Sequence, residues 1–282
     1  MGDGYEFRLL TLDSAELAEM SALLRSVFPK ARHLTERYLR WKYADNPDGR
    51  AIGCNAYLGG ELVGHMAALP MQGRLHGEEE RGLFFVNGAV HSAHRGRRLQ
   101  SRISAAMFDE AQRQDYAYCF GTGNRYSTGP LLTRFSLIGP LDARVGIGLP
   151  RRRAVPPAAD FERLWSEEAL RWRLANPEMS YDQEVRAGHL SVTAPAAPGI
   201  RALLYHGPNA WRIGGDGQSS RAPLRLWIGL DPGIDWSRSA FLPIPMRLRP
   251  SPLNLVFKDL SGRHAPPDPA RTVFRAIDFD PY

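Results

Sequence analysis

The sequence predicts an α/β (α+β) protein in which a mixed central sheet is flanked by helices. The first observation is that segments with the pattern of strands alternate with segments that have the periodicity of amphipathic helices. The second is a junction where an apolar stretch, residues 83–90, leads through a short basic turn with one glycine into an amphipathic helix. With 282 residues, of which 43% are apolar, the chain can form one large domain or two small ones.

The first 50 residues are predicted to form one strand followed by two helices. Residues 7–12 have a strand pattern, and Asp13 and Glu16 then form a capping box at the start of a helix that ends before Pro29. A second, short helix is predicted over residues 34–43, and it ends before an Asn-Pro-Asp-Gly run.

The next hundred residues are predicted to supply most of the sheet. Residues 51–58 and 61–69 flank a Gly-Gly pair and are expected to form a β-hairpin. The elements expected after it are a turn near 76–78, a strand over 83–90 with a bulge at Gly88, a helix from 97 to about 114, a strand over 116–121, a helix over 125–135 kinked at Gly129-Pro130, and a strand over 143–149.

A second domain is predicted after a linker at 149–159, a stretch rich in Pro, Ala and Arg. The predicted division is 1–150 and 160–282. The string Leu-Arg-Trp-Lys-Tyr-Ala-Asp-Asn-Pro that ends at Pro47 has a counterpart, Leu-Arg-Trp-Arg-Leu-Ala-Asn-Pro, that ends at Pro177. This echo favours a degenerate internal repeat, and the alternative is a helix end that happens to carry Asn-Pro, a common stop signal. Strands are expected in this half over 181–186, 189–193, 200–206 and 224–230.

Composition restricts the classes of ligand and the compartment. The net charge is +6 and arises mostly from arginine, which suits a phosphate-bearing ligand or nucleic acid, although a genome that prefers Arg to Lys would give the same excess. Cys54 and Cys119 lie in predicted strands without a C-x-x-C motif, so buried reduced thiols are expected, and the eight histidines show no metal-ligand spacing. With no signal peptide or membrane-spanning run recognised, we expect a cytoplasmic protein without metal or membrane partner.

The junction after residue 90 has the geometry of a phosphate-binding site. A turn of Arg95-Gly96-Arg97-Arg98 places free backbone N–H groups and the positive end of a helix at one point, which suits a pyrophosphate. This stretch resembles the acetyl-CoA-binding core of the GNAT (GCN5-related) acyltransferase superfamily, where a strand leads into Arg/Gln-x-x-Gly-x-Gly/Ala. Arg98 and Gln100 stand where that motif has small residues, and Arg98 is the main departure because a glycine lets the backbone approach phosphate closely.

A second string supports the resemblance. Trp41-Lys42-Tyr43, followed by Asn-Pro-Asp-Gly, is similar to the Trp-Lys-Tyr-x-x-Asn-Pro-x-Gly signature of one GNAT branch. Members of that branch include N-acyltransferases that act on nucleotide-linked amino sugars. The resemblance covers about residues 5–150 and implies a GNAT-like acyl-CoA-binding domain at 1–150. Residues 160–282 are then expected to form a degenerate second GNAT-like half or an accessory domain on the acceptor side. Trp41 and Tyr43 are also expected as core residues.

The resemblance implies which residues contact the donor, an acyl-CoA such as acetyl-CoA. The expected donor-binding residues lie along the strand, in the phosphate turn and at the start of a later helix. They are Ala89, Val90, His91, Arg95, Gly96, Arg97, Arg98, Leu99 and Asn124. The family's usual general acid is a tyrosine, and its position is taken by Leu132, which leaves Tyr126 as the nearest substitute. Candidates for the base are Asn87, His91 and His65, and deprotonation through a water molecule is the alternative.

The function expected from these features is acyl transfer from acyl-CoA to a small-molecule amine, with a nucleotide-linked amino sugar favoured by the signature. A non-catalytic GNAT-like module that binds CoA or a partner is the alternative. A nucleic-acid binder ranks last, because the basic residues are not interleaved with aromatic residues in a recognisable module. A homodimer is compatible with the sequence.

Overall fold

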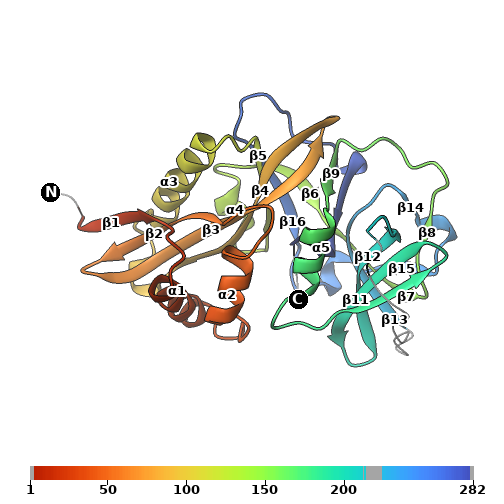
Figure 1. Cartoon of the computed structure of the whole chain (residues 1–282), viewed down its shortest axis with the longest axis horizontal. Helices are drawn as coiled ribbons and strands as arrows, with labels where there is room; N and C mark the ends of the chain where they lie inside the picture. The colour runs from red at the N-terminus through yellow and green to blue at the C-terminus, as the bar shows by residue number, and fades with distance from the viewer. Residues whose placement is uncertain (1–2, 212, 214–223, 280–282) are drawn as a thin grey trace.

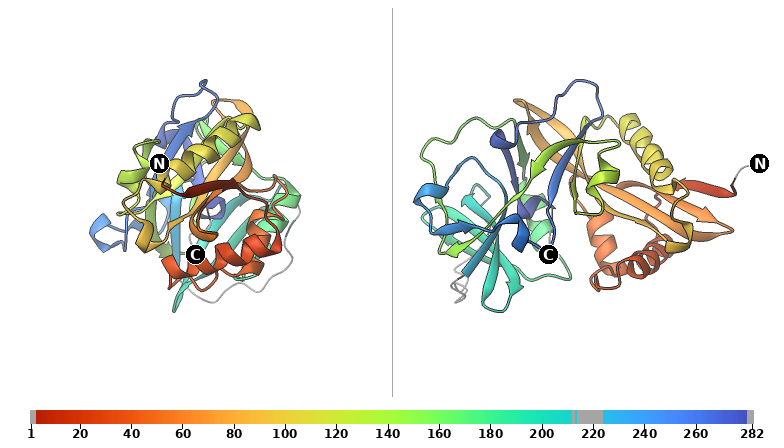
Figure 2. Two further views of the ribbon diagram at one scale, coloured as in Figure 1. Left: turned by 90° about the vertical axis from the view of Figure 1, so that its left-hand side faces the viewer. Right: turned by 180° about the vertical axis from the view of Figure 1, so that it is seen from behind.

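The computed structural model describes residues 3–211, 213 and 224–279. In these residues fifteen strands form one continuous mixed sheet, and β8 (Arg151–Arg152) pairs separately with β14 (Ile234–Asp235). Figure 1 shows two lobes side by side, and Figure 2 shows them from two other directions. The predicted α/β class with a mixed central sheet is confirmed.

The N-terminal lobe is built mainly from the first half of the chain. Its elements are β1 (Tyr5–Leu9), α1 (Ser14–Val27), α2 (Glu36–Tyr43), β2 (Ile52–Leu58), β3 (Glu61–Leu75), β4 (Glu78–Val90), η1 (Ser92–His94), α3 (Leu99–Arg113), β5 (Tyr118–Gly123), α4 (Thr128–Leu131) and β6 (Ser136–Pro140). Helix α3 covers one face of this sheet, and α1 and α2 cover the other (Figures 1 and 2).

The second lobe is formed mainly by the rest of the chain. The elements of this part of the chain are β7 (Asp142–Ile147), β8, β9 (Phe161–Leu164), α5 (Glu167–Leu174), β10 (Asp182–Arg186), β11 (His189–Ala197), β12 (Ile200–Pro208), β13 (Leu224–Leu230), β14, η2 (Trp236–Arg238), β15 (Phe241–Pro243), η3 (Met246–Leu248), β16 (Asn254–Asp259), η4 (Pro269–Arg271), β17 (Thr272–Arg275) and α6 (Ala276–Phe279). Of these, β16 lies in the sheet of the N-terminal lobe.

Local sequence signals account for the first helix. The Asp13 carboxylate accepts the N–H of Glu16 at 2.9 Å, and the Glu16 carboxylate reaches back to the N–H of Leu12 at 2.7 Å. The first bond satisfies an N–H group of the first helical turn, and the second fixes the residue before the N-cap. The apolar period then buries Leu17 and Met20 completely. The predicted capping box is therefore confirmed.

Some predicted boundaries were wrong. The helix expected over 125–135 is a single turn, α4, and Pro130 has no N–H that could extend it back to the carbonyl of Tyr126. The strands on either side of the turn at 76–78 are much longer than expected, because their outer halves pair with each other beyond the core. The bulge expected at Gly88 is confirmed, since the β3–β4 register shifts opposite it.

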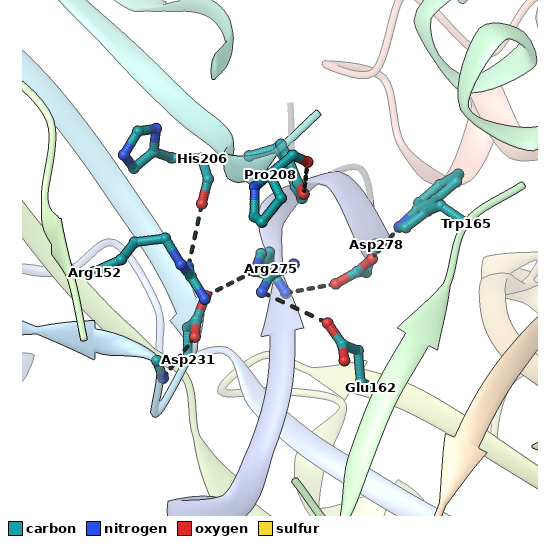
Figure 3. Close-up of polar contacts among 10 residues, drawn as sticks. Arg152, Glu162, Trp165, His206, Pro208, Asp231, Arg275 and Asp278 are labelled. Atoms are coloured by element: carbon teal, nitrogen blue, oxygen red, sulfur yellow. Dashed lines mark hydrogen bonds and ion pairs between the residues drawn. The ribbon is translucent and has the colours of Figure 1, made fainter. Parts of the chain in front are cut away.

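The segment expected to be a linker at 149–159 includes part of the second lobe's structure. Arg152 lies in β8 and donates to the buried carboxylate of Asp231 at 3.0 Å, and Arg275 of β17 donates to the same oxygen at 2.8 Å (Figure 3). Burial raises the pKa of Asp231, but the two arginines outweigh burial and hold that pKa below its usual value.

The two similar strings that end at Pro47 and Pro177 belong to a repeat in the structure. In each lobe a short helix, α2 or α5, precedes an antiparallel three-stranded meander, β2–β3–β4 or β10–β11–β12. The last strand of each meander then pairs in parallel with the following long strand, β5 or β13. Thr35 caps α2 and Ser166 caps α5 in the same way, each accepting the N–H three residues on.

The two lobes exchange strands. Strand β16, from the C-terminal part of the chain, lies between β5 and β6, and β7, which precedes residue 150, lies between β13 and β15. A chain ended at residue 155 would therefore lose a strand from the middle of the N-terminal sheet. The boundary between 1–150 and 160–282 stays a prediction for the folding units, and the hydrogen-bonded sheet does not break there.

The core is continuous between the lobes. Phe120 of β5 is fully buried, and its ring lies 4.3 Å from that of Phe161 in β9 and 6.1 Å from that of Phe274 in β17, measured between ring centroids. Burial of such rings is the main stabilising contribution at this junction. The apolar contacts thus fix the N-terminal sheet against the second lobe.

Candidate functional site

The two central parallel strands of the N-terminal lobe separate near their C-terminal ends. Pairing between β4 and β5 extends only from Gly82–Tyr118 to Phe84–Phe120. Beyond Phe84, β4 bulges, and Asn87 there has a left-handed φ of 52°. The strands therefore leave an opening between their unpaired edges.

Backbone donors of β4 face this opening. The N–H of His91 donates to the carbonyl of Val63 in β3 at 2.9 Å. Because N–H groups alternate along a strand, the N–H of Val90 points to the opposite side, toward the separated β5. An extended amide-bearing ligand can pair with this edge as an additional strand would.

Cavities lie on both sides of the opening. The larger, of about 380 Å³, is bounded by the segment after α1, by α2, β4, β5 and the C-terminal helix, and its lining includes Lys42, Asn87 and Phe279. The smaller, of about 150 Å³, lies between α3 and α4. Phe85 lines both cavities. The two cavities therefore share part of their wall next to the opening.

The turn before α3 holds unpaired backbone donors and exposed cations. Gly96 has φ 77° and Arg98 has φ 57°, and α3 begins at Leu99. The first helical bond after the turn is from Arg102 N–H to the carbonyl of Arg98, so the N–H groups of the intervening residues have no helical acceptor. Among the residues that the structure describes, no carboxylate pairs with Arg95, Arg97 or Arg98.

These features suit the predicted anion site, which stays a prediction, and the structure adds one feature that the motif does not show. Arg98 occupies the left-handed region, where a glycine has no steric cost and another residue is strained. Arg98 thus holds a left-handed backbone that a glycine would adopt without strain. Its exposed guanidinium adds positive charge at the same place.

The other predicted site residues lie around the opening but do not all meet. The Asn124 side chain accepts the N–H groups of Tyr126 at 2.8 Å and Ser127 at 3.0 Å, and so begins the segment that leads to α4. Tyr126 is 81% exposed, and His91 is half-buried beside the turn with its ring 5.9 Å from that of His94. Neither Tyr126 nor His91 is among the described residues that line the larger cavity.

The prediction that His65 lines the cleft as a candidate base was wrong. It is fully buried, and its two ring nitrogens contact Tyr43 Oη at 3.1 Å and Asn55 Oδ1 at 2.7 Å. Burial lowers the pKa of His65 to about 3. His65 is not among the described residues that line either cavity.

Sequence reasoning missed the buried polar chain that His65 belongs to. Asn87 Nδ2 donates to Tyr43 Oη at 2.7 Å, and at the other end Asn55 Nδ2 donates to Glu16 Oε1 at 2.9 Å. Burial raises the pKa of Tyr43 well above its usual value. The available signal was a histidine and an asparagine at facing positions in two core strands, where polar residues need partners.

The remaining chemical groups lie elsewhere. Cys54 and Cys119 are buried free thiols, as predicted. Among the described residues, one group could hold a metal ion, Glu78, Glu80 and His264 at the β3–β4 turn, and Arg263 already donates to Glu80 at 2.6 Å. The expectation that no metal takes part stays a prediction. No helix in the described part of the chain is long and apolar enough to cross a bilayer.

A mixed sheet whose central parallel strands separate beside a glycine-containing turn and a helix N-terminus is the arrangement of the GNAT fold. Residues 7–135 match the family model of an acetyltransferase (GNAT) domain. The match covers β1 to the end of the α4 segment and includes the turn at Gly96 and the opening between β4 and β5.

Solved structures share this fold over most of the chain. A protein from Enterococcus faecalis, described as a probable N-acyltransferase, is 12% identical with a TM-score of 0.59, covering 91% of this chain and 73% of that one. Eis1 from Mycobacterium abscessus is 8% identical with a TM-score of 0.60, covering 91% and 74%. The N-myristoyltransferase of Saccharomyces cerevisiae, solved with myristoyl-CoA, is 12% identical with a TM-score of 0.57, covering 92% and 81%. No curated protein matches this sequence.

Proposed function

We propose that this protein is an N-acyltransferase that transfers an acyl group from acyl-CoA to an amine. The observation that carries the proposal is the coincidence of three features: separated strands β4 and β5, unpaired N–H groups at the start of α3, and exposed arginines in the turn between. Acyl-CoA has an extended amide-bearing arm and a pyrophosphate, and these features suit both parts. The match of residues 7–135 to an acetyltransferase domain supports the same conclusion.

The donor would lie across the opening. The pyrophosphate would accept from the N–H groups at Leu99 to Ser101 and pair with the guanidinium groups of the turn. The pantetheine arm would lie along the free edge of β4, where the N–H of Val90 is available. This places the thioester at the larger cavity, with strand N–H groups as donors for the carbonyl oxygen.

The chemistry then needs a neutral amine in that cavity. Its lone pair forms a bond to the thioester carbon while the carbonyl electrons move to oxygen. When the tetrahedral adduct collapses, the C–S bond breaks and CoA leaves as a thiolate. One proton leaves the nitrogen and one reaches the sulfur. We assign the second transfer to Tyr126, whose hydroxyl is exposed near the start of α4, with His91 as the second candidate for a proton-transfer role.

The lining of the larger cavity favours an acceptor without a large positive charge. Its polar members include Lys42, His33 and Asn87, and no Asp or Glu is among its described lining residues. Phe28, Leu34 and other apolar side chains supply the rest of its wall. A nucleotide-linked amino sugar is anionic and presents an amine, so it is the acceptor that we favour. The signature around Trp41 points to the same class.

A non-catalytic CoA-binding module is the second candidate, and two observations favour it. Arg98 stands where the motif has a small residue, and Leu132 takes the place of the family's tyrosine and is 41% exposed. This alternative predicts CoA binding without transfer.

One experiment separates the two candidates. The intact protein is incubated with acetyl-CoA and each member of an amine panel, and free thiol is measured with a thiol reagent. Nucleotide-linked amino sugars, aminoglycosides and peptides form the panel. Amine-dependent thiol release supports the enzyme, and CoA binding with no amine-dependent release supports the module. Release with peptides or aminoglycosides only would remove the amino-sugar assignment.

A further inference from the structure

Asn87 has an unusual backbone at the wall of the proposed acceptor cavity. It lies in the bulge of β4 with φ 52°, a left-handed conformation that asparagine tolerates better than most residues. Its side chain lines the larger cavity and is half-buried. Strained backbone of this kind persists where the surroundings fix it, and here those surroundings are a chain of buried hydrogen bonds.

The direction of that chain is set at its far end by Glu16. The Glu16 carboxylate accepts from the N–H groups of Thr11 and Leu12 at 2.8 and 2.7 Å, and from Asn55 at 2.9 Å. A carboxylate that is surrounded by donors can only accept. Asn55 must therefore direct its NH₂ group toward Glu16 and its carbonyl oxygen toward the next member of the chain, His65.

The same reasoning fixes each further hydrogen bond. His65 Nδ1 lies 2.7 Å from the Asn55 oxygen, so Nδ1 carries the proton and Nε2 of the neutral ring accepts. The Tyr43 hydroxyl must donate to Nε2 at 3.1 Å, which leaves its oxygen to accept. Asn87 must then direct its NH₂ group inward to Tyr43, at 2.7 Å.

The chain of hydrogen bonds uses the NH₂ group of Asn87 and leaves its carbonyl oxygen, Oδ1, available as an acceptor. The described residues provide no hydrogen-bond partner for it. We propose that Asn87 Oδ1 accepts a hydrogen bond from the attacking amine and directs the amine's lone pair toward the thioester carbon. This inference rests on the proposed function and adds a positioning contact for its acceptor. Tyr43, His65, Asn55 and Glu16 act through Asn87 by fixing which end of its amide faces the cavity.

The proposal also selects the class of nucleophile. A neutral amine attacks with its lone pair while its N–H groups stay in place, so it can donate to Oδ1 throughout the attack. An alcohol must lose its only proton as it attacks, and a carboxamide oxygen cannot take that proton. The site should therefore transfer acyl groups to nitrogen much faster than to oxygen.

The central test compares two variants with the parent. Asn87→Gly removes the side chain and keeps a residue that adopts φ 52° without strain, so it is expected to fold. Tyr43→Phe removes the hydroxyl that holds the Asn87 amide. The acceptors are a nucleotide-linked amino sugar and benzylamine, with benzyl alcohol as the matched oxygen nucleophile, and acetyl-CoA is the donor. CoA affinity is measured by calorimetry.

For Asn87→Gly we expect kcat/KM for the amines to fall about 10- to 100-fold with CoA affinity unchanged, and a smaller fall for Tyr43→Phe. Benzyl alcohol should give no measurable ester. Equal amine kinetics in the parent and Asn87→Gly would overturn this inference and leave the proposed function standing. Absence of transfer by the parent to any amine would remove both.

A second measurement does not depend on activity. Nitrogen-15 NMR of the histidine rings reports the tautomer of His65, and we expect the neutral ring with its proton on Nδ1. A proton on Nε2 would reverse the direction of the whole chain and turn the NH₂ group of Asn87 toward the cavity, which would contradict the proposal.

Discussion

Trp41 and Trp172 donate hydrogen bonds to each other's backbone. The indole N–H of Trp41 donates to the carbonyl of Trp172 at 3.0 Å, and the indole N–H of Trp172 donates to the carbonyl of Trp41 at 2.9 Å. Their rings stack with centroids 4.9 Å apart. The two residues occupy equivalent positions in α2 and α5. Their reciprocal hydrogen bonds are therefore related by an approximate two-fold axis that passes between them.

Replacing either tryptophan by Phe should cost the same free energy of unfolding. Each variant removes one equivalent hydrogen bond and part of one stacked ring, at about 1 to 3 kcal/mol. Urea unfolding measures the cost, and Trp236→Phe is the control because, among the described residues, its indole N–H has no acceptor. A large cost at one position and none at the other would show that the relation is not symmetric.

Gly96→Asp should abolish CoA binding while the fold survives. The new carboxylate would repel the pyrophosphate, and φ 77° strains any side chain there. Gly77→Asp is the matched control, because Gly77 has φ 91° and, like Gly96, has open space around it. Calorimetric titration is the measurement. If Gly96→Asp folds and binds CoA like the parent, the donor does not lie at this turn.

Arg98→Gly should weaken the salt dependence of CoA binding. The substitution removes one cation at the turn and relieves the left-handed strain at φ 57°. Stability should change by less than about 1 kcal/mol, because glycine also gains entropy in the unfolded chain. CoA affinity is measured over a range of ionic strength, and an unchanged slope would show that the Arg98 charge does not act on the donor.

Tyr126→Phe should lower turnover with little change in CoA affinity. A proton donor to the leaving thiolate acts in the transition state, so its loss appears in kcat. Steady-state kinetics with acetyl-CoA and the best amine of the panel provide the measurement. Unchanged turnover would remove Tyr126 from the mechanism and leave proton transfer to another group or to solvent.

Stability should fall as the pH is lowered from 6.5 toward 5. Burial lowers the pKa of His65 to about 3, and burial together with Arg152 lowers that of His206 to about 4. In this range the unfolded chain binds protons that the folded protein does not, so each histidine contributes a slope of up to about 1.4 kcal/mol per pH unit. Above pH 6.5 both contributions are complete. His206→Asn should remove part of the slope, and an unchanged slope would contradict the assignment.

The sequence was sufficient where local signals determine structure. Asp13 and Glu16 predicted the start of α1, and the basic junction at Gly96 predicted a turn followed by a helix, because capping and helix N-termini depend on neighbouring residues only. The internal echo at Trp41 and Trp172 was also visible, although nothing in it could show that the two indoles bond to each other's backbone.

Features that depend on distant segments could not be predicted. The insertion of β16 between β5 and β6 follows from pairing across more than a hundred residues, which periodicity does not report. The polar chain behind Asn87 combines residues from α1, α2 and three strands, so no spacing of residues along the sequence indicates it. His65 was misplaced for this reason, since its ring is buried against Tyr43 of α2 and Asn55 of β2.

The most direct test of the central claim is the product itself. The intact protein is given acetyl-CoA labelled in the acetyl group and a nucleotide-linked amino sugar or another amine, and the labelled amide and released CoA are quantified by mass spectrometry. The account predicts one amide for each CoA released by the parent and Gly77→Asp, and none by Gly96→Asp. Release of CoA without amide, or equal product from Gly96→Asp, would contradict it.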